Sequence, residues 1–462
     1  MSASRGPVFL GSLVLLALCV VLPANADEAP LFVDATAAAG FRHVHVKPSL
    51  DARLEPIMPW MSALGAAACV ADYNRDGKLD LFATNSRQGE PNFLYRNNGD
   101  GTFTEVGATA GVARWNDAGG VAMDCVWGDV DNDGWPDLFV ARWGRSLLLH
   151  NRGDGSFEDV TAQRFRRVDG SPGTDWKNTN AAIFFDLDND GRLDVFVTNI
   201  TSTRYLREGN MLWHNQGPGE DGIPRFVDVA AETGTFDAGW GWGAKFFDAD
   251  ADGDLDLVAA DGFVTAGEGD YWLRLGKWRS GPHDPLDALA WPPLENMSFS
   301  GSEPLRFFRN DADGATFSER AREVGLVSQR DNRGVVVFDA DDDGDLDVYV
   351  ANQGQPADFF RNQGVPGNHW LIVELVGDPT AGTTRDAVGA LVSAQTSERR
   401  MLRLRDGGSS FCGQSDPRLY FGLGHAERVE KLEIRWPGGG VETLEGVKAD
   451  QILTIRQAVG AR

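Results

Sequence analysis

A nine-residue acidic pattern occurs five times in the chain and constrains its fold more than any other feature of the sequence. In each copy, positions 1, 3 and 5 carry Asp or Asn, position 6 is Gly and position 9 is Asp. The copies begin at Asp72, Asp129, Asp186, Asp248 and Asp339, so successive starts lie 57, 57, 62 and 91 residues apart. Regular recurrence at this spacing predicts a repeat architecture in which each unit buries its apolar face against a neighbour.

Short apolar segments recur in step with the acidic pattern. One precedes each copy, as at 181–185, and another follows it, as at 138–140. A fourth segment begins with Phe after a Gly-rich turn. The third segment ends in Arg or His followed by Asn, at Arg96-Asn97, His150-Asn151, His214-Asn215, Arg309-Asn310 and Arg361-Asn362. Four short apolar runs bounded by Gly, Asn and Asp predict the four strands of a β-propeller blade.

The chain ends predict how the propeller closes. No fourth segment follows the last acidic loop, but residues 32–40 resemble residues 103–111, which contain a fourth segment. We therefore expect the N-terminal strand to complete the last of five blades, which removes exposed sheet edges. A sixth, degenerate blade within residues 261–305 is the alternative. The predicted fold class is all-β: a propeller of about five four-stranded blades over residues 27–365, then a small β-sandwich over residues 366–462.

The acidic loops have the ligand chemistry of calcium sites. Calcium takes six to eight oxygen ligands, and carboxylates at alternate positions of a tight loop supply them, with a main-chain carbonyl at position 7. An EF-hand would place Glu at position 12 between helices, whereas here position 12 is Ala or Val inside a predicted strand. The alternative, an Asp/Gly turn without metal, does not explain why oxygen donors recur at four positions in five copies. We expect about five Ca²⁺ ions and, because no His or Cys joins the loops, no transition metal.

The candidate metal-binding residues are positions 1, 3, 5, 7 and 9 of each loop. They are Asp72, Asn74, Asp76, Lys78 and Asp80; Asp129, Asp131, Asp133, Trp135 and Asp137; Asp186, Asp188, Asp190, Arg192 and Asp194; Asp248, Asp250, Asp252, Asp254 and Asp256; and Asp339, Asp341, Asp343, Asp345 and Asp347.

The N-terminus and the net charge indicate an exported protein that does not bind nucleic acid. Arg5, the apolar run 8–22 and Ala24-Asn25-Ala26 form a Sec-type signal with predicted cleavage after Ala26, and the run is too short for a membrane span. A lipoprotein site at Cys19 is disfavoured because Leu18 precedes it. The chain carries 43 basic and 68 acidic residues, a net charge of −25. Such a surface repels phosphate backbones and needs cations to be compact.

The three cysteines outside the signal allow at most one disulfide. Cys69 and Cys125 occupy similar places in successive repeats, and Cys412 lies near the C-terminus. The preferred interpretation of each is a small buried apolar residue.

The repeats resemble the FG-GAP/VCBS family of propellers, which includes the calcium-binding blades of integrin α subunits. The C-terminal segments 368–375, 385–390, 407–416, 417–424 and 434–439 resemble the ASPIC/UnbV domain, which follows such propellers in bacterial proteins and in cartilage acidic protein. The resemblance implies calcium-dependent extracellular recognition, without a defined reaction.

Two functions remain open at this point. The first is an exported binding or adhesion module, with structural calcium and an extracellular protein or glycan as partner. The second is an enzyme acting on saccharides or small exported molecules, with a site in the central channel or on the face of the long loops. That face includes the 261–305 insertion, whose aromatic residues form either a recognition surface or a cover for the blade: Tyr271, Trp272, Trp278 and Trp291, among Arg274, Lys277, Arg279 and His283.

Other residue groups have structural interpretations. Trp240 and Trp242 are expected to line the channel, and His150 and His214 to be structural third-strand residues. His43 and His45 lack the acid spacing of a metal site. Ser and Asp in Gly-rich turns are usually backbone caps, so we predict no catalytic residues among Asp406, Ser409, Ser410, Asp416 and His425.

Overall fold

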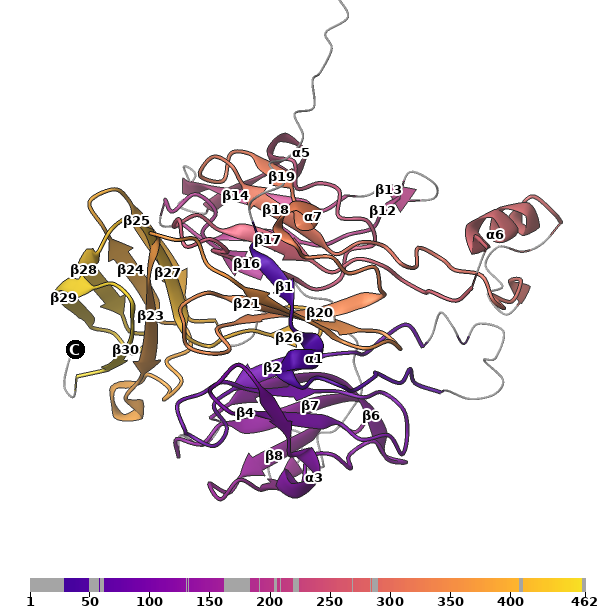
Figure 1. The fold of residues 1–462 in the computed structure, drawn as a ribbon, viewed down its shortest axis with the longest axis horizontal. Coiled ribbons are helices and arrows are strands. Elements are labelled where there is room, and N and C mark those ends of the chain that lie inside the picture. Colours follow the sequence, from indigo (N-terminus) through magenta and orange to yellow (C-terminus); the bar gives the residue numbers. More distant parts are fainter. Residues whose placement is uncertain are drawn as a thin grey trace, which may run out of the picture.

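The computed structural model contains the five predicted four-stranded antiparallel sheets (Figure 1). It describes residues 29–49, 58, 62–129, 131, 133–161, 183–190, 192–202, 206–207, 209–218, 224–267, 269–282, 284, 290–406 and 410–458. The predicted signal segment lies outside the described residues.

Each blade follows the order predicted from the repeats. The first blade is β2 (Ala68–Ala71), β3 (Asp80–Ala83), β4 (Phe93–Asn97) and β5 (Phe103–Glu105). The second is β6 (Gly120–Gly128), β7 (Asp137–Gly144), β8 (Leu147–Asn151) and β9 (Phe157–Asp159). The third is β10 (Ile183–Phe185), β11 (Asp194–Val197), β14 (Met211–Pro218) and β15 (Pro224–Asp228), with the hairpin β12 (Thr201–Ser202) and β13 (Leu206–Arg207) between its second and third strands. The fourth is β16 (Ala244–Phe247), β17 (Asp256–Ala259), β18 (Arg306–Asn310) and β19 (Phe317–Glu319).

The fifth blade joins the two ends of the propeller sequence, as predicted. It contains β20 (Asn332–Phe338), β21 (Asp347–Asn352) and β22 (Asp358–Asn362), and its outer strand is the N-terminal β1 (Phe32–Asp34). β1 pairs antiparallel with β22 in the register Phe32↔Asn362. Inner strands contact one another in the order β6, β2, β20, β16, β10, with an apolar core at each of these junctions. The chain between the second and third blades, residues 162–182, lies outside the described residues.

A one-turn helix follows four of the outer strands. These helices are α1 (Thr36–Ala39), α3 (Gly107–Ala110), α5 (Ala230–Thr233) and α7 (Ala321–Val324). Each ends at a glycine in the left-handed region, such as Gly40 with φ 94°, where residues with a side chain are disfavoured. This shared strand–helix–glycine unit explains why residues 32–40 resemble residues 103–111.

The described residues of the insertion between 261 and 305 do not form a sixth blade, so that alternative is wrong. Its described residues form the helix α6 (Tyr271–Arg279) and isolated bridges such as Val264↔Phe299. Tyr271, Leu275 and Phe299 are buried in a small apolar core that belongs to the insertion. The α6 helix projects from the propeller on the side away from the C-terminal domain (Figure 1).

Cys69 and Cys125 form a disulfide, which corrects their interpretation as isolated buried residues. They lie on the inner strands β2 and β6, which are neighbours in the ring. The repeat therefore brings equivalent positions of successive blades together, and the bond links the first blade to the second. Cys412 is buried with a free thiol.

The C-terminal domain packs two sheets around one core, as predicted for a β-sandwich. One sheet is β27 (Leu419–Gly424), β23 (His369–Val376) and β30 (Gln451–Arg456). The other is β25 (Arg400–Leu404), β24 (Leu391–Gln395), β28 (Arg428–Arg435) and β29 (Val441–Lys448). A short 3₁₀ helix, η3 (Pro379–Ala381), follows β23.

A segment of this domain, residues 410–416, lies along the inner strands of the propeller; we call it the channel segment. Its strand β26 (Gly413–Gln414) pairs in parallel with β2. The side-chain oxygen of Ser410 accepts from the N–H of Ala244 at 2.8 Å, and the Gln414 side chain accepts from the N–H of Trp127 at 2.7 Å. The N–H of Asp416 donates to a carbonyl of β20 at 2.9 Å. Because it contacts inner strands of four blades, the channel segment lies at the propeller axis.

The two tryptophans expected to line the channel occupy different surroundings. Trp242 lies against Phe411 of the channel segment, with ring centroids 5.2 Å apart. Trp240 instead stacks on Phe263 of the insertion core at 4.1 Å. The prediction therefore holds for Trp242 and is wrong for Trp240.

The buried His43 lies where the first and fifth blades meet, and it predicts that the protein loses stability at low pH. Its ring nitrogens lie 2.9 Å from the Tyr95 hydroxyl and 3.2 Å from the Tyr349 hydroxyl, between the first and fifth blades. Burial lowers its pKa from 6.5 to about 4. Between pH 6.5 and pH 4, the unfolded chain therefore binds a proton at His43 that the folded chain does not bind. The contribution of this site to the free energy of unfolding is complete above pH 6.5 and is lost towards pH 4.

We expect wild type to lose up to about 3 kcal/mol more unfolding free energy than His43→Gln between pH 7 and pH 4. Denaturant titrations at each pH measure this difference. His425→Gln, at an exposed site, should leave the wild-type pH dependence in place, and parallel profiles for wild type and His43→Gln would contradict the prediction.

Candidate metal centres

The backbone of the acidic loops takes the same conformation wherever the structure describes it. Position 4 has a left-handed conformation at Arg75, Asn189, Ala251 and Asp342, with φ between 56° and 58°. The glycine at position 6 is also left-handed, with φ 87° at Gly77, 94° at Gly134, 96° at Gly253 and 91° at Gly344. Two left-handed residues close together reverse the chain sharply, which explains the predicted need for Gly at position 6.

Side chains at positions 1 and 5 hold the loop closed through backbone N–H groups. The position 5 carboxylate accepts from the N–H of position 7 in every loop, as from Lys78 to Asp76 at 3.0 Å and from Asp254 to Asp252 at 2.9 Å. The position 1 carboxylate accepts from the glycine N–H in four loops, at 2.8–2.9 Å. These bonds point the carboxylates into the loop, so the candidate ligands of one loop converge.

Position 9 connects each loop to the third strand of its blade. Its carboxylate accepts from the N–H of the strand-ending Asn at 2.7–2.8 Å in all five blades. The Asn side chain then donates to a loop carbonyl of the adjoining blade: Asn97 to Ala340, Asn151 to Tyr73 and Asn362 to Ala249, each at 2.8 Å. The sequence showed this Asn in every repeat, but its role in linking blades was missed.

We predict that Asn97→Ala lowers the unfolding free energy by about 2–3 kcal/mol, because two buried carbonyls lose their donor. The neighbouring Asn98, whose side chain bonds only Thr102 and Thr104 at the surface, provides the matched control. Asn98→Ala should change stability by about 0.5 kcal/mol or less. Equal effects of the two substitutions in denaturant melts would rule out the blade-linking role.

The acidic loops contain more carboxylate oxygens than the hydrogen-bond donors around them can satisfy. Ligand atoms lie within 4.8 Å of one another in the groups Asp129/Asp131/Asp133, Asp186/Asp188/Asp194 and Asp248/Asp250/Asp252. Buried oxygens Oδ2 of Asp80, Oδ1 of Asp129 and Oδ1 of Asp341 have no hydrogen-bond partner among the described residues. Oxygen donors in this arrangement fit a hard divalent cation.

Burial of these carboxylates raises their pKa values when no cation is present. The pKa of Asp80 rises to about 8, chiefly through burial and then through Asp72 and Asp76 nearby. The pKa of Asp339 rises to about 7 and that of Asp129 to about 6, again chiefly through burial. A bound cation would favour the ionised form and offset this cost.

The third-strand Arg or His faces the loop of its own blade. Arg309 pairs with Asp250 at 2.7 Å, and Arg361 pairs with Asp341. In the second and third blades the equivalent residues are His150, 3.0 Å from Asp137, and His214, 3.1 Å from Asp188. Their predicted strand position is correct, but the expectation that no histidine joins the loops is wrong. The strand-ending Asn that bonds the position 9 carboxylate comes directly after this Arg or His. It therefore holds the Arg or His side chain at the loop.

The C-terminal domain covers the loop face with arginines. Arg385 lies 3.8 Å from Asp129, Arg399 pairs with Asp254, and Arg403 donates to Asn189 at 3.3 Å. Trp370 packs so closely on Gly344 that an added Cβ would lie 1.8 Å from its ring, a second reason for glycine there.

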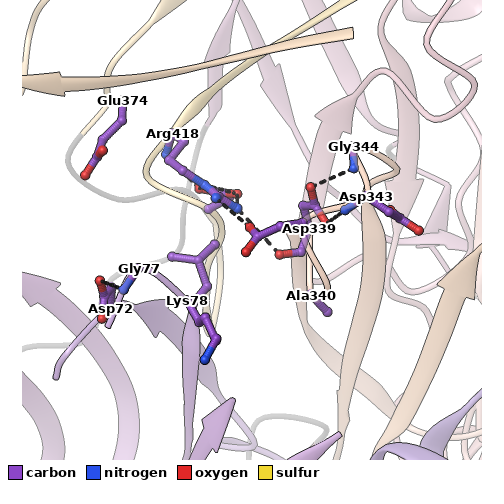
Figure 2. A network of polar contacts seen from close by, with 12 residues as sticks. Asp72, Gly77, Lys78, Asp339, Ala340, Asp343, Gly344, Glu374 and Arg418 are labelled. Carbon is purple, nitrogen blue, oxygen red and sulfur yellow. Dashed lines mark hydrogen bonds and ion pairs between the residues drawn. The ribbon is translucent and has the colours of Figure 1, made fainter. Parts of the chain in front are cut away.

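Arg418 makes the most buried of these arginine contacts. It bonds Asp416 at 2.9–3.1 Å and Asp342 of the fifth loop at 3.0 Å. Figure 2 shows it pointing to Asp339, with Asp72 of the first loop nearby. Burial acts to lower the pKa of Arg418, but Asp416 raises it above its usual value.

We predict that Arg418→Met destabilises the protein by about 3–5 kcal/mol, because it leaves the largely buried Asp416 carboxylate without its partner. Arg435→Met is the matched control: it removes an exposed ion pair with Glu433 in the same domain and should cost about 1 kcal/mol or less. Thermal or urea unfolding measures both, and comparable losses would contradict the importance of the buried Arg418–Asp416 pair.

The Ser, Asp and His residues for which no catalytic role was predicted make structural contacts where the structure describes them. Ser410 caps Ala244 in the channel, Asp416 pairs with Arg418, and His425 lies 3.0 Å from the Gly367 carbonyl. Ser409 lies outside the described residues.

Two family models match the chain. The model described as FG-GAP-like repeat matches residues 72–140, 129–197 and 186–259, and the model described as ASPIC and UnbV matches residues 380–462. The chain is an FG-GAP repeat protein with an ASPIC/UnbV domain. This confirms the resemblance inferred from the repeats and the C-terminal segments.

The relatives of this FG-GAP repeat protein include cartilage acidic protein 1 from three vertebrates. The human protein is 25% identical over 394 residues, covering 81% of this chain and 50% of the relative. The Xenopus tropicalis protein is 30% identical over 390 residues, covering 82% and 42%, and the Mus musculus protein is 26% identical over 438 residues, covering 82% and 62%. The chain thus spans between 42% and 62% of these relatives' length.

Among solved structures, an Agrocybe aegerita lectin that recognises non-reducing terminal N-acetylglucosamine is similar at 16% identity. The match covers 64% of this chain and 67% of the lectin chain, with a TM-score of 0.20. Within the described part of the FG-GAP repeat protein, no helix combines the length and hydrophobicity needed to cross a bilayer.

Proposed function

We propose that this FG-GAP repeat protein is an exported, calcium-stabilised binding module that recognises an extracellular protein or glycan. The observation that carries the proposal is the repeated convergence of buried carboxylates, some of whose oxygens lack a hydrogen-bond partner among the described residues, such as Asp80 and Asp341. Carboxylates at this density need cations to remain ionised in a folded chain. The predicted signal segment and the relatives named cartilage acidic protein support export.

Calcium at these loops would be structural. Positions 1, 3, 5 and 9 would supply side-chain oxygens, and position 7 a main-chain carbonyl. Extracellular modules bind calcium with dissociation constants of roughly 10⁻⁴–10⁻³ M. At tenfold excess over that constant each ion adds about 1.4 kcal/mol, so five would add about 7 kcal/mol. This is comparable to the whole stability of an ordinary domain.

The surfaces that the chain itself covers support one place for ligand recognition. The C-terminal domain packs on the loop face, and the channel segment lies at the axis. The face of the long connections remains, and it carries a hollow of 820 Å³. The hollow is lined by Lys47 of the 41–63 connection, by Arg87 between β3 and β4, and by residues of the insertion that include Thr265, Trp291 and Glu295. Charged groups beside an aromatic ring suit polar ligands such as saccharides or protein loops.

We predict that chelation lowers the melting temperature of the full chain strongly and that excess calcium restores it. Asp343→Asn tests a single loop, because Asn keeps the oxygen that accepts from the N–H of Asp345 and loses only the charge. This variant should bind one calcium fewer by isothermal titration, and its stability should match wild type in chelator but fall below it by about 1.4 kcal/mol in calcium.

The matched control is Asp100→Asn, at an exposed acid in a turn outside the loops. It should keep the wild-type calcium stoichiometry. An identical melt of the wild-type protein in chelator and in calcium would refute the proposed role of calcium.

A further inference from the structure

Two of the five acidic loops contain an imidazole among their carboxylates. The Nδ1 atom of His150 lies 3.0 Å from Oδ1 of Asp137 and 3.6 Å from Oδ2 of Asp131. In the third blade, Nε2 of His214 lies 3.1 Å from Oδ2 of Asp188. Ligand atoms of Asp131, Asp137 and His150 all lie within 4.8 Å of one another, as do those of Asp188, Asp190 and His214. Each group therefore converges on a single point.

The spacing in the second blade is that of ligands around one small ion. Zinc bonds to carboxylate oxygen and imidazole nitrogen are about 2.0–2.2 Å long, so tetrahedral ligands lie about 3.4 Å apart. The separations of 3.0 and 3.6 Å between Nδ1 of His150 and the two carboxylates bracket this value. The same loop also presents Oδ1 of Asp129, which is buried without a hydrogen-bond partner among the described residues and belongs to a group with Asp131. This oxygen is available as a fourth ligand.

The fourth and fifth blades show what the histidines replace. There Arg309 and Arg361 occupy the equivalent strand position and pair with Asp250 and Asp341. A guanidinium stays protonated and has no lone pair to give to a metal, whereas a neutral imidazole does. Imidazole also shifts a site from hard cations towards Zn²⁺, Cu²⁺ and Ni²⁺. The chain therefore contains two chemical classes of loop.

We propose that the second and third loops bind a transition metal ion such as Zn²⁺, while the other three bind calcium. His150, Asp131 and Asp137 form the first site, with Nε2 of His150 carrying the ring proton and Nδ1 facing the ion. His214, Asp188 and Asp190 form the second; here the Gln216 amide, 2.9 Å from Nδ1 of His214, must turn its oxygen to that atom, so that Nδ1 carries the ring proton and Nε2 faces the ion. Arg192 pairs with Asp190 and must be displaced, so the second blade binds more tightly. This inference rests on the proposed metal-binding role of the loops and changes the identity of two of their ions.

The test is isothermal titration of the full chain with Zn²⁺ in excess calcium. Wild type should bind two equivalents, His150→Arg should lose the tighter one, and His150→Arg/His214→Arg should lose both, each by at least about tenfold in affinity. Arg is the residue that the fourth and fifth blades carry at this position, so the substitution suits the fold. Arg96→Lys, at the equivalent position of the first blade, is the matched control and should retain both equivalents.

Nitrogen ligation provides a second readout that a purely structural role would not produce. Electron paramagnetic resonance of the Cu²⁺-loaded protein should show nitrogen hyperfine coupling in wild type and in Arg96→Lys, and none from these sites in the double variant. Melting temperatures in calcium verify that each variant is folded.

The outcomes separate this inference from the proposed function. Wild-type zinc binding by the double variant, or no zinc binding by wild type in excess calcium, overturns the inference. In either case, the proposed function is still supported if calcium raises the melting temperature in the same experiments. If neither calcium nor zinc raises the melting temperature, both fail.

Discussion

Buried carboxylates at the loop end of each blade are the constraint on which the rest of this structure depends. The position 9 aspartate fixes the third strand through the N–H of the following Asn, and that Asn reaches a loop carbonyl of the adjoining blade. The acids are therefore part of the ring's hydrogen bonding as well as candidate cation ligands. Burial raises the pKa of several of these carboxylates. Without bound cations, keeping them ionised therefore lowers the free energy of unfolding, although the same groups join the blades. The cations of the proposed function would offset this cost.

The C-terminal domain is integrated into the propeller. Its arginines lie over the acidic loops, where they offset part of the negative charge, and its channel segment runs along inner strands of four blades. Close approach of this segment requires glycine on the propeller: a Cβ at Gly334 would lie 2.0 Å from the Cys412 carbonyl oxygen. One face and the axis are thus used for intramolecular contacts. This leaves the face of the long connections as the surface on which the proposed recognition would take place.

Much of the fold could be predicted because its information is local and repeated. Asp, Asn and Gly two to five residues apart specify the loop through side-chain-to-backbone bonds, and recurrence of that pattern sets the number of blades. The N-terminal strand was predictable because residues 32–40 repeat a complete strand–helix–glycine unit. The candidate ligands converge within each loop for the same reason. The insertion at 261–305 has no such repeat, and its burial around Tyr271 and Phe299 depends on packing that residue order does not reveal.

The amino-acid sequence by itself determined the all-β repeat, the five acidic loops and the strand that joins the two ends of the ring, since turn chemistry and strand alternation act over a few residues. Tertiary structure alone decided which distant groups meet. It paired Cys69 with Cys125, brought the channel segment to β2 and placed Arg418 over the fifth loop. Each of these contacts depends on the closure of neighbouring blades or on the docking of the second domain, and local turn chemistry does not specify such long-range geometry.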